Sequence, residues 1–137
     1  MKLALLAALV APAVSAAPAS TDDSELKKLA GKWTVESFDF GGAPVESMQD
    51  AVREFKDNTY TLIPSSGAKY DGTVKLDATT EPKQIDLVLP DRVLKGIYLL
   101  EGDQLKLAYT LEGDARPTAF ESKPDSGVVL VVHKRAK

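Results

Sequence analysis

The chain of 137 residues carries a formal net charge of −3 and contains no cysteine, which excludes a disulfide scaffold and thiolate metal sites. Positive and negative side chains alternate without a basic stripe, so a nucleic-acid partner is not expected. The fold must therefore be held by a hydrophobic core, and a chain of this length can bury one.

The first residues have the pattern of a secretory signal peptide. A short basic start is followed by an unbroken apolar run over residues 3–10 and then by small residues. The apolar run is far shorter than the ~20 residues that a membrane span needs, so we expect cleavage after Ala16 or Ala17 and no membrane insertion. The expected organisation is a signal peptide over residues 1–17 and one domain over residues 18–137, exported to the periplasm or the exterior.

Residues 22–30 are predicted to form one short helix. Acidic side chains lie in its first turn and lysines in its last, and Gly31 follows at the position where helices commonly end. Leu26 and Leu29 are three residues apart, so they share one apolar face. We expect this face to plug a larger apolar structure.

From residue 32 onward, apolar and polar residues alternate with a period of two, and the runs are separated by turn residues. A helical turn is also expected within residues 44–50. Short connections between strands favour an antiparallel up-and-down barrel or a flattened sheet, so the fold class is all-β with one N-terminal helix. Eight strands are predicted, over residues 32–40, 51–56, 59–63, 68–76, 84–89, 93–100, 104–111 and 128–134.

The alternation also predicts which side chains face inward. Residues 128–132 are apolar on both faces, so we expect the outer face of the last strand to be covered by the N-terminal helix or by a partner.

An eight-stranded barrel has room for its own side chains or for one small ligand, so any cavity should be small and near the open rim. The inward set is expected to be bulky, with Gly72 as the main relief, and includes Tyr70, Leu76, Leu87, Leu105, Leu107 and Tyr109.

Several short motifs resemble those of lipocalins. Gly31 and Trp33 resemble the Gly-x-Trp signature of lipocalins and the wider calycin group, and Arg135 resembles the basic residue that packs across that tryptophan. These motifs and the further matching pieces given below, taken in their order along the chain, are similar to a lipocalin-like family of exported bacterial proteins best known from planctomycetes. The chain departs from that family pattern at Ala108, where the pattern has cysteine. The resemblance implies an eight-stranded lipocalin-like barrel and no particular activity. The other matching pieces are residues 29–33, 75–77, 82–86, 96–98, 102–105, 116–117 and Phe120.

Trp33 can be interpreted as a cavity-lining residue or as a plug at the closed end of the barrel. We favour the plug, because an indole buries a large apolar area and needs only one partner for its N–H. A guanidinium on its face adds ~0.5–2 kcal/mol. Gly31, Trp33 and Arg135 are therefore expected to close the barrel together.

The candidate ligand-binding residues are four tyrosines and one arginine. The tyrosine hydroxyls could meet a ligand, although strand tyrosines more often pack with the hydroxyl at a rim. Arg116 precedes a proline, which favours an extended backbone and leaves its guanidinium able to act as a structural latch or as an anion site. The tyrosines are Tyr60, Tyr70, Tyr98 and Tyr109.

Catalytic and metal sites are not expected, and neither is a cofactor. His133 is the one histidine of the sequence, and neither a nucleophile motif nor a spaced ligand pair accompanies it, so it is expected at the surface near the end of a strand. Asp77, Glu81, Asp86 and Asp91 lack the spacing of a calcium loop and are expected to form a solvated edge. Lys83 and Asp86 resemble family positions, and this resemblance implies a structural ion pair or a loop clamp as the alternative.

Two classes of function remain. The first is a non-catalytic, monomeric, exported binding module for a small apolar molecule that enters opposite Trp33. The alternative is a structural or protein-interaction domain with a filled core, whose partner is another exported protein. A cavity of a few hundred cubic ångströms lined by apolar side chains would favour the first class. A packed interior with an exposed apolar patch would favour the second.

Overall fold

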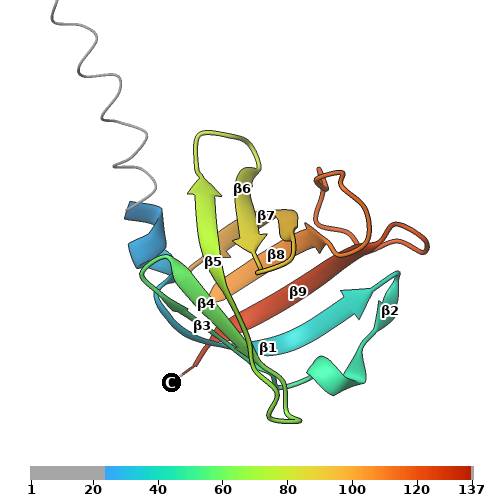
Figure 1. The fold of residues 1–137 in the computed structure, drawn as a ribbon, viewed down its shortest axis with the longest axis horizontal. Helices are drawn as coiled ribbons and strands as arrows, with labels where there is room; N and C mark the ends of the chain where they lie inside the picture. The colour runs from blue at the N-terminus through green and yellow to red at the C-terminus, as the bar shows by residue number, and fades with distance from the viewer. Residues whose placement is uncertain (1–23, 137) are drawn as a thin grey trace, which may run out of the picture.

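Strand β1 (Gly31–Phe40) pairs with β3 on one side and with β9 on the other, and this second pairing closes the sheet into a barrel (Figure 1). The structure is a computed structural model that describes residues 24–136. Every strand pairing in it is antiparallel. Besides β1, its elements are β2 (Ala43–Pro44), the 3₁₀ turn η1 (Glu46–Met48), β3 (Val52–Lys56), β4 (Thr59–Ile63), β5 (Tyr70–Asp77), β6 (Lys83–Val88), β7 (Val93–Glu101), β8 (Gln104–Thr110) and β9 (Val128–Arg135).

The predicted eight-stranded barrel with one short helix is confirmed. Each expected strand is present, with ends within two residues of those predicted, and the helical turn expected within residues 44–50 is η1. The extra strand β2 has two residues and pairs only with the end of β1. The expected signal peptide and its boundary at residue 17 lie outside the described residues.

A bulge in β1 explains how one strand serves three neighbours. Its first four residues pair with β3, its last two pair with β2, and the register with β9 shifts between Val35 and Ser37. An extra residue in one strand bends that strand and increases its twist. The bulge at Glu36 therefore lies where β1 leaves β3, and it helps the sheet to curve into a barrel.

The buried apolar side chains form one continuous core inside the barrel. Along β5 the buried apolar side chains alternate with exposed polar ones, and bulky Leu76, Leu87, Leu105 and Leu107 are buried as expected. Tyr70 differs from its expected inward position, because it begins β5 and its side chain is 55% exposed. It belongs to the rim of the barrel.

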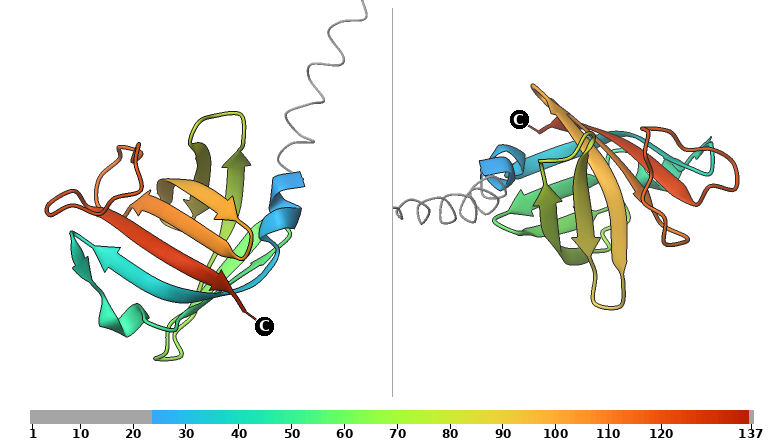
Figure 2. Two further views of the ribbon diagram at one scale, coloured as in Figure 1. Left: turned by 180° about the vertical axis from the view of Figure 1, so that it is seen from behind. Right: turned by 90° about the horizontal axis from the view of Figure 1, so that it is seen from above.

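The N-terminal helix, described over residues 24–29, lies at one end of the barrel (Figure 2). Leu29 is fully buried and Leu26 packs against the same core, so the apolar face acts as the plug that the sequence predicts. The helix therefore covers the end of the barrel and not the outer face of β9. Val128, Leu130 and Val132 on that outer face are half-buried. Within residues 24–136, no helix combines the length and apolar character needed to cross a membrane.

Candidate functional site

One end of the barrel is closed by Trp33, the helix and Arg135. Trp33 is fully buried, and its indole Nε1–H donates to the carbonyl of Leu29 at 2.9 Å. The guanidinium carbon of Arg135 lies 4.2 Å from the centre of the Trp33 ring, which is the stacking expected from the sequence. Arg135 also donates to the carbonyls of Lys28 and Ala30, both at 3.3 Å. It therefore ties the last strand to the end of the helix.

The backbone conformation of Gly31 allows this arrangement. Its φ angle is +118°, a conformation that L side chains rarely adopt, and an added Cβ would lie 3.7 Å from Arg135 Nη1. The glycine allows the chain to turn sharply from the helix into β1. Trp33 is thereby placed directly beneath the arginine.

A buried carboxylate fastens the helix from the opposite side of this closed end. Glu25 Oε1 accepts a hydrogen bond from the Tyr98 hydroxyl at 2.7 Å, and Lys83 Nζ lies 3.2 Å away. Lys28 Nζ pairs with Oε2 at 2.9 Å. Burial raises the pKa of Glu25, but the hydrogen bonds from Tyr98, Lys28 and Lys83 outweigh it and hold the pKa at about 2. Tyr98 therefore serves the closed end.

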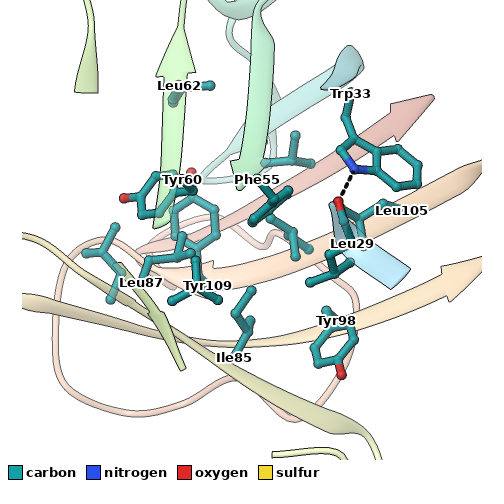
Figure 3. Packing of buried hydrophobic residues seen from close by; sticks show 14 of the residues in the cluster. Leu29, Trp33, Phe55, Tyr60, Leu62, Ile85, Leu87, Tyr98, Leu105 and Tyr109 are labelled. Carbon is teal, nitrogen blue, oxygen red and sulfur yellow. Dashed lines mark hydrogen bonds between the residues drawn. The ribbon is translucent and has the colours of Figure 1, made fainter. Parts of the chain in front are cut away.

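The opposite end of the barrel contains an open cavity of about 630 Å³. Phe38, on its wall, lies five residues beyond Trp33 along β1, which places the cavity away from the closed end. Figure 3 shows this separation, with Tyr60, Leu87 and Tyr109 grouped apart from Trp33 and Leu29. The apolar part of the lining includes Phe38, Leu62, Leu87, Leu89, Leu94 and Leu111.

Arg53 is the unusual residue of this cavity. It projects inward from β3, is 1% exposed and lies among the cavity-lining side chains. Its guanidinium carbon is 5.6 Å from the centre of the Tyr60 ring and 5.8 Å from that of Tyr109. Both distances fall within the range of cation–π interactions. The charge of Arg53 thus lies between two aromatic rings inside the barrel.

His133 holds the guanidinium in place. Arg53 Nε–H donates to His133 Nε2 at 3.1 Å, and His133 Nδ1 lies 3.0 Å from the carbonyl of Leu105. A carbonyl can only accept, so the ring carries its proton on Nδ1 and is neutral. Burial and the charge of Arg53 lower the pKa of His133 to about 3. The expected surface position of His133 was wrong, because this residue shares the inward face of β9 with Val129 and Val131.

Two glycines lie against the tyrosines that flank Arg53. Gly72 lies opposite Tyr60 in the β4–β5 pair, and Gly96 lies opposite Tyr109 in the β7–β8 pair. A Cβ on Gly72 would come within 2.7 Å of Tyr60 Cε1, and a Cβ on Gly96 within 2.8 Å of Tyr109 Cβ. Burial raises the pKa of the Tyr60 hydroxyl to about 12, although Arg53 lowers it in part. Tyr60 therefore keeps its proton at neutral pH.

The structure brings only part of the expected ligand-binding set together. Tyr60, Tyr70 and Tyr109 line the open cavity, whereas Tyr98 contacts the helix at the closed end. Arg116 is also outside the cavity lining. Of the two interpretations of Arg116, its contacts support the structural latch.

Arg116 attaches the loop of residues 111–127 to the outer surface of the barrel. Its Nη1 donates to the carbonyls of Gly96 at 2.8 Å and Ile85 at 3.2 Å, joining β6 and β7. Its Nη2 lies 2.8 Å from Asp86 Oδ1, a close ion pair, although this oxygen accepts no hydrogen bond of regular geometry among the described residues. Asp86 is thus a latch partner and not a member of a purely solvated edge.

Arg53 was missed at the level of sequence. Arg53 lies on the same face of a predicted strand as Ala51 and Phe55, and both of these neighbours are buried. A basic residue between two apolar residues at a spacing of two was the available signal. Among residues 24–136, no group of three or more His, Cys, Asp or Glu side chains is placed to hold a metal ion.

The fold and its cavity define an eight-stranded antiparallel barrel that is plugged at one end and hollow at the other. Comparison with protein-family models, with curated proteins and with solved structures finds no match for this chain.

Proposed function

We propose that this chain is an exported, non-catalytic, lipocalin-like binding module for a small and largely apolar molecule. The observation that supports the proposal best is the open-end cavity of about 630 Å³ with its mainly aliphatic and aromatic lining. Small-molecule sites commonly have this volume and a few polar groups within an apolar wall. The proposed export rests on the signal-peptide pattern of the sequence.

The exposed surface gives less support to the protein-interaction alternative. Among the described residues, the large apolar side chains that are exposed are Tyr70, Val93 and Leu99. Isolated apolar residues are normal on a protein surface. One of the three, Tyr70, also lines the mouth of the cavity. Its exposure is therefore accounted for by the proposed site.

The volume favours a compact ligand. The cavity is confined to the open end, because the closed end is filled by Leu29, Trp33 and Tyr98. A branched or aromatic molecule fits this shape better than a long lipid chain, which would need the closed half of the barrel.

A neutral fluorescent probe tests the proposal. N-phenyl-1-naphthylamine, which carries no charge, is titrated into the protein while its emission and the thermal stability of the protein are followed. A ligand that binds only the folded state at a hundred times its dissociation constant adds about 2.7 kcal/mol to the free energy of unfolding. We expect saturable binding of one probe per chain with a corresponding rise in melting temperature.

Two tryptophan variants locate the binding. Leu89→Trp places an indole at the cavity wall, and Leu99→Trp places one on the exposed outer face of β7. The first variant should weaken probe binding at least tenfold, and the second should leave it unchanged. Equal effects of the two variants, or no saturable binding to the wild-type protein, would contradict the proposed function.

A further inference from the structure

Arg53 is a positive charge in a largely apolar interior. Among residues 24–136, no acidic side chain forms an ion pair with it. A buried charge without a counter-ion is strongly unfavourable compared with the same charge in water. Arginine does not relieve this by losing its proton. The charge of Arg53 therefore calls for a negative charge from outside the described residues.

The protein groups around Arg53 do not balance it. His133 and the Tyr109 hydroxyl, which lies 3.4 Å from Nη2, are neutral, and the two tyrosine rings attract the cation without carrying a negative charge. Within the described part of the chain, these hydrogen bonds use two of the five N–H groups of the guanidinium. Among the described residues, the other three N–H groups, two on Nη1 and one on Nη2, make no hydrogen bond.

The charges at the mouth of the cavity cancel one another. Lys69 and Arg92 contribute two positive charges to the lining, and Asp71 and Asp91 contribute two negative charges. Arg53 therefore leaves the cavity with a net positive charge at its buried part. In an apolar environment this charge attracts an anion more strongly than it would in water.

Two hydroxyl groups stand beside the guanidinium. Tyr109 accepts from Arg53, so its own O–H remains able to donate, and Tyr60 keeps its proton at neutral pH. The planar guanidinium can hold two oxygens of a carboxylate side by side, and tyrosine hydroxyls can add further donors. The donor set thus suits a planar anion in particular.

We propose that the molecule bound in the open-end cavity carries a carboxylate on a compact apolar body, and that Arg53 binds this carboxylate. This inference rests on the binding function proposed above and names the chemical class of its ligand. The carboxylate lies against the guanidinium, with the Tyr60 and Tyr109 hydroxyls beside it. The apolar body extends along the aliphatic wall toward the rim.

Matched pairs of acid and alcohol test the inference. 2-Naphthoate is compared with 2-naphthalenemethanol, and decanoate with 1-decanol, by calorimetric titration of the full chain at pH 7. Within each pair the apolar body is nearly the same and only the charged group differs. We expect the acid to bind roughly tenfold to a hundredfold more tightly than its alcohol, as hydrogen bonds to a charged group imply.

Two substitutions assign the preference to the arginine. Arg53→Met removes the charge while keeping an unbranched side chain, and should abolish the preference of the protein for acid over alcohol. Its folding is checked by circular dichroism, because the substitution also removes the donor that His133 Nε2 has in the wild-type protein. Arg53→Lys keeps the charge but loses the planar fork, and should retain part of the preference.

The outcomes separate the two proposals. Equal binding of acid and alcohol to the wild-type protein would overturn the carboxylate inference and leave the binding function standing. So would a preference that persists in Arg53→Met. Failure of both members of both pairs to bind would overturn the binding function and the carboxylate inference together.

Discussion

Arg53 and His133, 80 residues apart in the chain, meet inside the barrel at 3.1 Å between Nε and Nε2. The neutral imidazole accepts from the guanidinium through Nε2 and donates its Nδ1–H to the carbonyl of Leu105. This is a directional arrangement, because a protonated imidazole could not accept from Arg53 and would place two positive charges in contact. The site is therefore built for a neutral histidine.

The stability of the protein should fall as the pH is lowered below 6.5. The pKa of His133 is 6.5 in its ordinary state and about 3 in the folded protein, so between these values the unfolded state binds more protons. Stability consequently rises with pH in this window and is fully present above pH 6.5. Lowering the pH to 5 should cost up to about 2 kcal/mol from this group. Urea denaturation at pH 7.5 and at pH 5 measures the loss.

The matched control for this effect is His133→Gln. Glutamine retains a hydrogen-bond acceptor for Arg53 but does not titrate, so the variant should show a smaller loss of stability between pH 7.5 and pH 5. Contributions from carboxylates outside the site are common to both proteins and cancel in the difference. Identical pH dependence of the two proteins would show that His133 does not carry the effect.

The carboxylate of Glu25 should stabilise the folded protein through its contacts with the helix. This contribution should be lost over a lower pH range than that of His133. Its pKa is about 2 in the folded protein against an ordinary value of 4.5, so its contribution is present above pH 4.5 and is lost as the pH falls toward 2. Glu25→Gln should lower the free energy of unfolding at pH 7 by about 1–2 kcal/mol, a value reduced because both lysine partners are partly exposed. The difference should disappear near pH 2, and a difference that is constant with pH would contradict the assignment.

The closed end predicts coupling between Trp33 and Arg135. Trp33→Ala should destabilise by ~3–5 kcal/mol, since it empties a large buried aromatic site. Arg135→Ala should cost less, because its side chain is partly exposed and near the end of the chain. In a double-mutant cycle the two losses should differ from additivity by at least ~0.5 kcal/mol, as expected for residues in contact. Strict additivity would mean that the stacking at 4.2 Å contributes nothing.

Gly72 should not accept a methyl group. A Cβ added to Gly72 would clash with two atoms, because it would lie 2.6 Å from the carbonyl oxygen of Val88 and 2.7 Å from Tyr60 Cε1. Gly72→Ala should therefore destabilise by about 1–3 kcal/mol, the usual range for overpacking, and should displace the Tyr60 ring. Thermal denaturation measures the first effect. A combined variant with Tyr60→Leu should lose less stability than the sum of the single changes, whereas additive losses would contradict the close contact.

The strands and the closing contact could be predicted because their signals are local. Alternation of apolar and polar residues marks each strand, and turn residues mark its ends. The Gly-x-Trp pattern, with a basic residue after the last strand, indicated that Trp33 and Arg135 meet. The strands depend on short segments, and the contact between Trp33 and Arg135 follows from the resemblance to lipocalins. The structure contains the strands and this contact.

The buried polar pair could not be predicted, because its inward direction depends on sheet register. β9 is apolar on both faces until His133, so its alternation does not show which face is inward. The pairing of His133 with fully buried Val35 and Leu105 places it inside, and the pairing with Val35 lies beside a bulge in β1. Arg53 was less ambiguous, since Val52 on the other face of β3 is apolar but Glu54 and Lys56 on that face are charged. Register is a property of neighbouring strands that one strand does not contain.

The most direct test of a ligand site at the open end uses two side-chain N–H groups as reporters. Arg53 lines the cavity and Trp33 Nε1–H lies at the closed end, and the Nε–H of Arg53 and the Nε1–H of Trp33 can each be followed in a nitrogen-15 correlation spectrum. Titration with 2-naphthoate should shift the Arg53 signal and the backbone amides of the cavity lining, while the Trp33 signal stays in place. A saturable shift of Trp33 with no change at Arg53, or no shift of either, would contradict the account.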